Sequence, residues 1–200
     1  MATIRVTKSS CFFASSALAL ASQLIVGADA SDDRTLLETS ATLYGSYKLK
    51  RVYFSAFSPI PDASSRLPLA PPPLVREHRL YQADWLMRFY GFEHREIVPA
   101  GGLLRLDIDP KLAWALAHRE RFPVDLNRAP RELLLRVPGL GTKTIDKLLA
   151  ARRARRLRCA DLAALRVSLK KVLPFVELAD HRPRREPAAP APGAQQGTLF

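Results

Sequence analysis

Cysteine is scarce in this sequence, since only Cys11 and Cys159 occur among its 200 residues. This scarcity excludes a disulfide-rich scaffold and any zinc or iron–sulfur site built only from cysteines of this chain. His94, His118 and His181 do not have the spacing of metal ligands. No glycine-rich nucleotide loop precedes a helix in the first half of the chain. Because the sequence also shows no nucleophile–base pair, we predict no metal site and no catalytic residue.

Long apolar runs are lacking too, since none reaches the length that a bilayer requires. We therefore expect no membrane association. The first 30 residues still resemble a secretory signal, with two early positive charges, a mildly apolar stretch over residues 11–21 and the small-x-small string Ala28-Asp29-Ala30. Ser15 and Ser16 interrupt that stretch. A secreted basic protein is one alternative, which sequencing the mature N-terminus would test.

Acidic residues are few in the second half of the chain. The whole sequence holds 31 Lys and Arg against 19 Asp and Glu, a net charge of +12. Residues 1–110 are almost balanced, with 12 basic and 11 acidic side chains, whereas residues 111–185 hold 19 basic and 7 acidic ones. A solvated helix face would interleave both signs. Clustered cations instead favour binding to a nucleic acid that weakens as salt rises.

The richest motif of the sequence lies within this basic region. Residues 125–143 predict a helix, a tight turn over Pro138-Gly139-Leu140-Gly141 and the start of a second helix. The pattern resembles the helix-hairpin-helix family of DNA-binding modules. The second helix would begin with unpaired amides and a positive dipole end, which suits a phosphate. Phosphate contacts carry no base information, so we expect binding that is independent of sequence.

The expected DNA-binding residues fall into two groups. Backbone contacts would come from Gly139, Leu140, Gly141 and Thr142, and charge from Lys143, Lys147, Arg152, Arg153, Arg155, Arg156 and Arg158. The alternative is an ordinary turn between two helices, in which the glycines only cap the first helix.

The first part of the chain predicts a strand–helix–strand unit. Residues 23–28 are short, β-branched and closed by glycine, and residues 50–57 form a similar run. Between them, Asp32 or Asp33 would cap a helix that continues to Tyr47. Such a unit implies a parallel pair of strands, and two strands alone cannot make a stable parallel sheet.

Further helices follow a proline-rich loop over residues 59–73. We predict helices at residues 74–90, after Asp109-Pro110, on each side of the glycine turn, and at residues 161–165 and 169–176. The last two would duplicate the first pair, but their turn lacks glycine, so we expect only a packing partner. The expected core of residues 74–90 is Leu80, Trp85, Leu86 and Phe89. The expected core of the first pair is Leu133, Leu134, Val137, Ile145, Leu148 and Leu149.

Three local roles complete these expectations. Asn127 would cap the first helix of the pair, and Cys159 would be a small core residue. Glu77 and Asp84 share a helix face seven residues apart, a spacing at which carboxylates are usually just solvated.

Four strings in order give a more specific resemblance. They are residues 52–61 (VYFSAFSPIP), 76–86 (REHRLYQADWL), 107–111 (DIDPK) and 122–125 (FPVD). The series resembles the C-terminal part of a bacterial family of radical SAM proteins described as DNA modification or repair proteins. That resemblance, over about residues 23–176, implies the end of a partial (β/α) barrel followed by a helix-hairpin-helix tail.

The sequence departs from that family in one decisive respect. The family holds a [4Fe–4S] cluster with C-x3-C-x2-C and cleaves S-adenosylmethionine, and this chain has no such triplet. We therefore expect a C-terminal fragment without a cofactor of its own, and an α+β, mainly α fold. The expected segments are an unmatched N-terminus (1–22), the barrel remnant (23–61), a connecting helix and loops (62–110), the helix-hairpin-helix domain (111–178) and a disordered tail (179–200).

The predicted function is sequence-independent DNA binding in a repair or modification context, in the cytoplasm. The alternative is one part of a split radical SAM enzyme, whose companion chain completes the barrel. Gln196, Leu199 and Phe200 end the chain in a pattern that resembles the peptide by which bacterial repair proteins dock onto the sliding clamp, so that clamp is a second expected partner.

Overall fold

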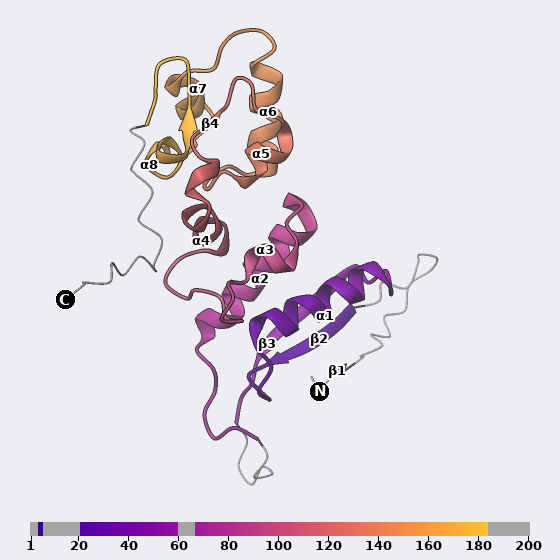
Figure 1. Ribbon diagram of the computed structural model, residues 1–200. Coiled ribbons are helices and arrows are strands. Elements are labelled where there is room, and N and C mark those ends of the chain that lie inside the picture. Colours follow the sequence, from indigo (N-terminus) through magenta and orange to yellow (C-terminus); the bar gives the residue numbers. More distant parts are fainter. Residues whose placement is uncertain (1–3, 6–20, 60–66, 184–200) are drawn as a thin grey trace, which may run out of the picture. The chain divides into compact units, whose positions relative to one another are not determined.

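The computed structural model describes residues 4–5, 21–59 and 67–183 (Figure 1). They form an α+β fold that is mainly helical, which confirms the predicted class. The chain divides into two compact units, Met1–Trp114 and Ala115–Phe200. Each unit has its own set of buried apolar residues and so its own core.

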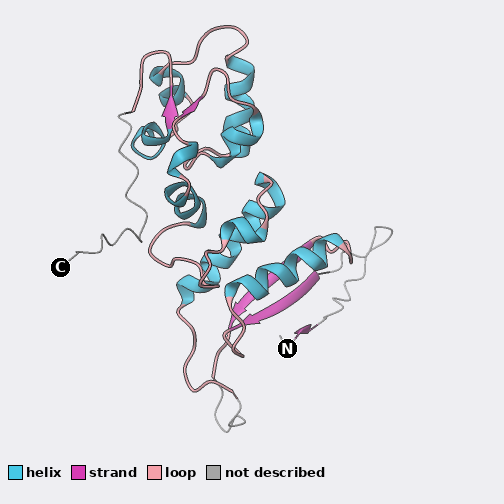
Figure 2. Cartoon of the chain, viewed as in Figure 1, coloured by secondary structure: helices cyan, strands magenta, loops and turns pink. Residues whose placement is uncertain are grey.

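A small sheet forms the centre of the first unit. Strand β2 (Ala21–Val26) pairs in parallel with β3 (Arg51–Ala56), and Leu24 lies opposite Phe54. Helix α1 (Asp33–Gly45) connects the two strands, which confirms the predicted strand–helix–strand unit (Figure 2). A short strand β1 (Ile4–Arg5) pairs antiparallel with β2, in a segment where no element was predicted.

Helix α1 begins at the expected cap. The Asp32 carboxylate accepts hydrogen bonds from the Thr35 amide at 2.8 Å and from the Thr35 hydroxyl at 2.7 Å. Both bonds favour the ionised carboxylate, so they lower the pKa of Asp32. The helix then buries Leu36 and Leu37 in a core that also contains Leu24, Val26, Val52 and Phe54. Strand alternation explains why only every second strand residue is in that core.

Helix α2 (Leu74–Tyr90) supplies side chains that occupy one edge of β3. The amides of Phe54 and Ala56 donate to the Tyr81 hydroxyl at 3.0 Å and to the Glu77 carboxylate at 2.8 Å. Tyr81 also donates to the Phe54 carbonyl at 2.8 Å. Side chains therefore satisfy backbone groups that an edge strand would otherwise leave open.

Asp84 lies near the same edge of β3, where its carboxylate is not solvated as expected. Tyr44 accepts from the Val52 amide at 3.0 Å and donates to Asp84 at 2.6 Å. Asp84 is buried and also lies 3.5 Å from Arg88, so the expectation of a solvated carboxylate was wrong. Burial raises the pKa of Asp84 and that of Tyr44.

The predicted core of α2 is only half correct. Leu80 and Leu86 are buried, but Trp85 is 53% exposed and Phe89 is 45% exposed. The two aromatic rings pack against each other at a tilt of 47°, with centroids 4.5 Å apart. Trp85 and Phe89 are four residues apart and therefore lie on the same face of the helix. The periodicity of the sequence does not show whether that face is buried or exposed.

Two predicted helix boundaries are confirmed. Gly91 ends α2 in the left-handed conformation, with φ of 67°. Asp109 accepts a 2.9 Å hydrogen bond from the Leu112 amide, at the start of α4 (Pro110–Ala117). Between these helices, the chain forms the short α3 (His94–Ile97).

The second unit is a set of short helices with one small parallel pair of strands. After a 3₁₀ turn at Arg119–Arg121, its elements are β4 (Val124–Asp125), α5 (Arg131–Arg136), α6 (Thr142–Ala151), α7 (Cys159–Ala164), α8 (Leu169–Val172), a 3₁₀ turn at Leu173–Phe175 and β5 (Val176–Glu177). Val124 of β4 pairs with Val176 of β5, so the first strand of this unit lies beside its last one. Within residues 4–5, 21–59 and 67–183, no helix has the length and apolar character needed to cross a membrane.

Candidate nucleic-acid interface

Helices α5 and α6 and the turn between them, residues 137–141, form the first hairpin. Leu134, Val137, Ile145 and Leu148 are buried as predicted, and these residues hold the two helices together. Leu133 differs from the prediction because it is 40% exposed, and Leu149 is half-buried. The hairpin is thus anchored by the inward face of each helix. In the turn, Gly139 is exposed and Gly141 is half-buried, whereas Val137, Pro138 and Leu140 are buried.

Gly139 is required in the turn for two separate reasons. Its φ is 80°, a conformation that a residue with a Cβ rarely adopts. A Cβ at this position would also lie 2.9 Å from Val172 Cγ2 and 3.3 Å from Lys171 Cβ. The turn therefore packs closely against α8, while Gly139 itself stays exposed.

The first turn of α6 presents bare amides. Gly141 precedes the helix with φ of −90° and ψ of 158°, and it has no side chain with which to cap. The first hydrogen bond of the helix runs from the Ile145 amide to the Gly141 carbonyl at 2.9 Å. No acceptor in the described part of the chain bonds the amides of Thr142, Lys143 or Thr144. Such amides, at the positive end of the helix dipole, are suited to an anion.

Leu140 was predicted to offer its backbone to a phosphate, but its amide is already hydrogen-bonded within the turn. Its amide donates to the Val137 carbonyl at 3.3 Å, and its side chain is buried. Leu140 therefore closes the turn and fixes it to the core.

The cations near the first hairpin separate into two groups. Lys143, Lys147, Arg153, Arg156 and Arg158 are exposed. Within the described residues, their side chains form no ion pair or hydrogen bond. They are therefore available to a polyanion.

The other two arginines of the predicted cluster are engaged within the protein. Arg152 is half-buried, and its Nη1 donates to the carbonyl of Ala129 at 2.7 Å and to that of Leu126 at 3.3 Å. Arg155 forms an ion pair with Asp161. These two side chains fix the basic loop to the rest of the unit.

Asn127 does not cap α5, contrary to prediction. The helix begins at Arg131 after Pro130, whereas the Asn127 side chain accepts a 2.6 Å hydrogen bond from the Leu157 amide. Its amide nitrogen lies 3.4 Å from the Leu157 carbonyl. Asn127 thus attaches the end of the arginine-rich loop to the segment that precedes the first hairpin.

Sequence reasoning missed three further cations. Arg166, Lys170 and Lys171 are exposed on the turn and helix that follow α7. The repeated helix–turn–helix pattern in the sequence was the available signal, but it was interpreted as packing because the turn lacks glycine.

Cys159 is half-buried and does not belong to the core, contrary to the prediction. Its amide donates to the Asp180 carboxylate at 2.9 Å, and this bond lowers the pKa of Asp180. Burial and the nearby carboxylate raise the pKa of the Cys159 thiol. The thiol form is therefore favoured, which makes Cys159 a poor nucleophile.

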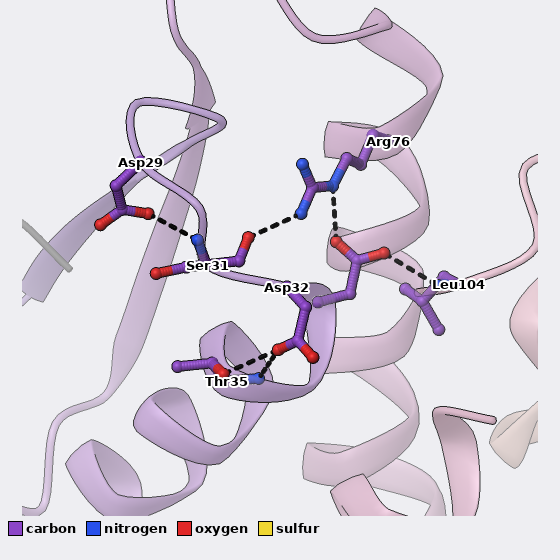
Figure 3. Close-up of polar contacts among 7 residues, drawn as sticks. Asp29, Ser31, Asp32, Thr35, Arg76 and Leu104 are labelled. Carbon is purple, nitrogen blue, oxygen red and sulfur yellow. Dashed lines mark hydrogen bonds and ion pairs between the residues drawn. The ribbon is translucent and has the colours of Figure 1, made fainter. Parts of the chain in front are cut away.

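The charged groups near the end of β2 have structural partners (Figure 3). Asp33 is buried, lies 2.7 Å from Arg76 Nε and accepts the Leu104 amide at 2.8 Å. Arg76 also donates to the Ser31 carbonyl at 3.0 Å. These bonds join α1, α2 and the loop around Leu104. Among the described residues, no group of three His, Cys, Asp or Glu side chains could hold a metal ion.

Comparison of the chain with models of protein families, with curated proteins and with solved structures found no match. The terminal residues Gln196, Leu199 and Phe200, predicted to bind a sliding clamp, lie outside the described residues.

Proposed function

We propose that this protein binds DNA independently of sequence, with the first hairpin acting as a helix-hairpin-helix module. The observation that carries the proposal is the set of bare amides at Thr142, Lys143 and Thr144 beside an exposed lysine. A phosphate oxygen accepts hydrogen bonds from amides at a helix N-terminus and is attracted by the helix dipole. Because the amides meet only the backbone of the nucleic acid, they cannot distinguish bases.

The exposed cations give this site its affinity. Lys143 and Lys147 belong to α6 itself, and Arg153, Arg156 and Arg158 follow it directly. Each cation that neutralises a phosphate releases a counterion, so affinity falls as salt rises. Arg152, Arg155 and Leu140 support the site by holding its backbone in place, and Gly139 supports it by allowing the turn.

The proposed context is DNA repair or modification, in a fragment that lacks a radical SAM cluster of its own. The buried position of β2 favours this proposal over export. Cleavage after Ala30 would remove β2, although Leu24 and Val26 are completely buried in the core of the first unit. Secretion would therefore remove part of the fold.

The proposal is tested by measuring duplex binding as a function of salt, by fluorescence anisotropy with two unrelated sequences. We expect similar affinity for both duplexes. If all five exposed cations contact phosphates, the slope of log K against log salt should be about −4 to −5. Clear preference for one sequence, or binding that salt does not weaken, contradicts the proposal.

Gly141→Asp is the sharpest variant for this test. Its carboxylate would accept the first-turn amides and place negative charge at the helix N-terminus, which stabilises a helix by about 0.3–1 kcal/mol. We expect DNA binding to be lost while the free energy of unfolding is maintained. Gly101→Asp adds the same charge at an exposed position of the first unit with nothing within 4 Å, so it is the matched control.

A second proposal concerns the sheet of the first unit. Parallel strands are normally covered on both faces, yet Tyr53 of β3 is 42% exposed on the face opposite the core. A companion chain that completes a barrel with its own C-x3-C-x2-C cluster would cover that face. A neighbouring reading frame that encodes C-x3-C-x2-C would support this second proposal. A genome without such a reading frame would contradict it.

A further inference from the structure

We propose that the DNA-binding surface extends beyond the first hairpin to Arg166, Lys170 and Lys171. These cations belong to the second hairpin, which consists of α7, residues 165–168 and α8. The inference rests on the proposed function, because it assigns more of the same polyanion-binding surface. From its sequence, this region was expected only to pack against the first pair of helices.

Each hairpin has one residue with a positive φ in its turn. Arg166 has φ of 56° where Gly139 has φ of 80°, and each lies two residues before the residue that caps the next helix. The Val172 amide donates to the Ser168 carbonyl at 3.2 Å, as the Ile145 amide donates to that of Gly141. By this correspondence, Lys170 occupies the position of Lys143. The second hairpin therefore places its positive-φ residue at the same distance from the next helix, although the hydrogen bonds of the two turns differ.

Arg166 closes α7 in the left-handed conformation, with its amide bonded to the Ala163 carbonyl at 2.9 Å and the Val167 amide bonded to the Leu162 carbonyl at 3.0 Å. A residue with a Cβ in the left-handed region costs of order 1–3 kcal/mol, and such outliers often mark functional sites. Glycine would form the same turn without the cost. The Arg166 side chain is exposed, and within the described residues it has no ion-pair partner that would account for its presence. The Arg166 charge is therefore available to an external anion.

The packing of the turns brings the second set of cations to the first hairpin. A Cβ at Gly139 would lie 3.3 Å from Lys171 Cβ, so the stem of Lys171 begins beside the first turn. Lys170 and Lys171 are both exposed and form no ion pair in the described part of the chain. The nearby acid Asp161 is already engaged by Arg155 and by the Arg158 amide at 2.8 Å. Exposed cations therefore lie both on the first hairpin and on α8, which packs against its turn.

Helix α8 is only four residues long, so its terminus is not the proposed site. The contribution is side-chain charge, placed where a duplex seated on the first hairpin meets it. We expect each of these cations to neutralise one phosphate and therefore to add about 1 to the salt slope.

Arg166→Gly separates function from stability. The variant relieves the left-handed strain, so we expect an unchanged or higher free energy of unfolding together with several-fold weaker duplex binding and a salt slope smaller by about 1. Lys171→Gln removes the charge but keeps the Cβ that lies near Gly139, and it should weaken binding in the same way. Lys48→Gly is the matched control, because Lys48 is also an exposed cation with φ of 55° but lies in the first unit.

The outcomes separate this inference from the proposed function. Weaker binding by Arg166→Gly and Lys171→Gln, but not by Lys48→Gly, supports it. If both variants bind like the wild type while Gly141→Asp does not bind, this inference is overturned and the first hairpin remains. Equal weakening by Lys48→Gly would reveal a general charge effect and would also overturn it. A wild-type protein that does not bind duplex DNA overturns both proposals.

Discussion

Arg152 Nη1 donates a 2.7 Å hydrogen bond to the carbonyl oxygen of Ala129, whereas the next residue, Arg153, is exposed to solvent. Two adjacent arginines in one basic run therefore have different tasks. The first holds the loop after α6 to the segment before α5. The second is free to meet a polyanion.

This difference predicts opposite effects of two neighbouring substitutions. Arg152→Ala leaves two carbonyls without a charged donor and should lower the free energy of unfolding by about 1.5–3 kcal/mol. Arg153→Ala should change stability by less than about 0.5 kcal/mol but reduce the salt slope of DNA binding by about 1. Urea unfolding and anisotropy on both variants check this. Equal destabilisation by the two would refute the assigned roles.

Replacing Gly139 should destabilise the second unit. In Gly139→Ala, the new Cβ meets Val172 Cγ2 at 2.9 Å and the backbone remains at positive φ, so we expect a loss of more than about 1 kcal/mol. Gly45→Ala is the control, because nothing lies within 4 Å of a Cβ at that helical position. That variant should be neutral or slightly stabilising. Thermal unfolding of both proteins measures the difference.

The hydroxyl of Tyr81 should matter more than that of Tyr53. Tyr81→Phe removes a group that accepts from the Phe54 amide and donates to the Phe54 carbonyl, so we expect a cost of about 1–3 kcal/mol. Tyr53→Phe changes an exposed side chain on the same strand and should be almost neutral. Chemical unfolding of the two variants tests whether α2 satisfies the edge of β3. Similar values for both would count against it.

The cap of α1 should make stability depend on pH. Because hydrogen bonds from Thr35 lower the pKa of Asp32, the folded state binds its proton less readily than the unfolded chain. The contribution is therefore complete above the ordinary value of 3.8 and is lost as pH falls through the lowered pKa. Asp32→Ala should cost about 1 kcal/mol at neutral pH and progressively less in acid. Unfolding curves of the wild type and of Asp32→Ala at neutral and at acidic pH test this expectation. A difference in the free energy of unfolding that does not change with pH would contradict it.

The sequence was a good guide to elements that local chemistry determines. The β-branched runs predicted β2 and β3, Asp32 and Asp109 predicted helix starts, and Gly91 predicted a helix end. In each case a residue acts on its own backbone or on neighbours within one turn. Such signals are readable without knowledge of the rest of the chain.

Partners that are distant in sequence were not predictable in the same way. Asn127 has a good capping side chain, but it bonds Leu157, 30 residues away, instead of α5. Asp84 resembles a solvated carboxylate until Tyr44 and Arg88 are placed beside it. The division between Arg152 and Arg153 likewise depends on a carbonyl that only the fold brings near.

The most direct test of the central claim observes the amides of Thr142, Lys143 and Thr144 themselves. In a ¹⁵N–¹H NMR titration with a short duplex at low salt, these three resonances should move most, together with those of neighbouring α6 residues. Raising the salt should return them to their free positions, because the contact is to phosphate. If the duplex binds and shifts other resonances while these three amides stay unchanged, the account of the first hairpin is wrong.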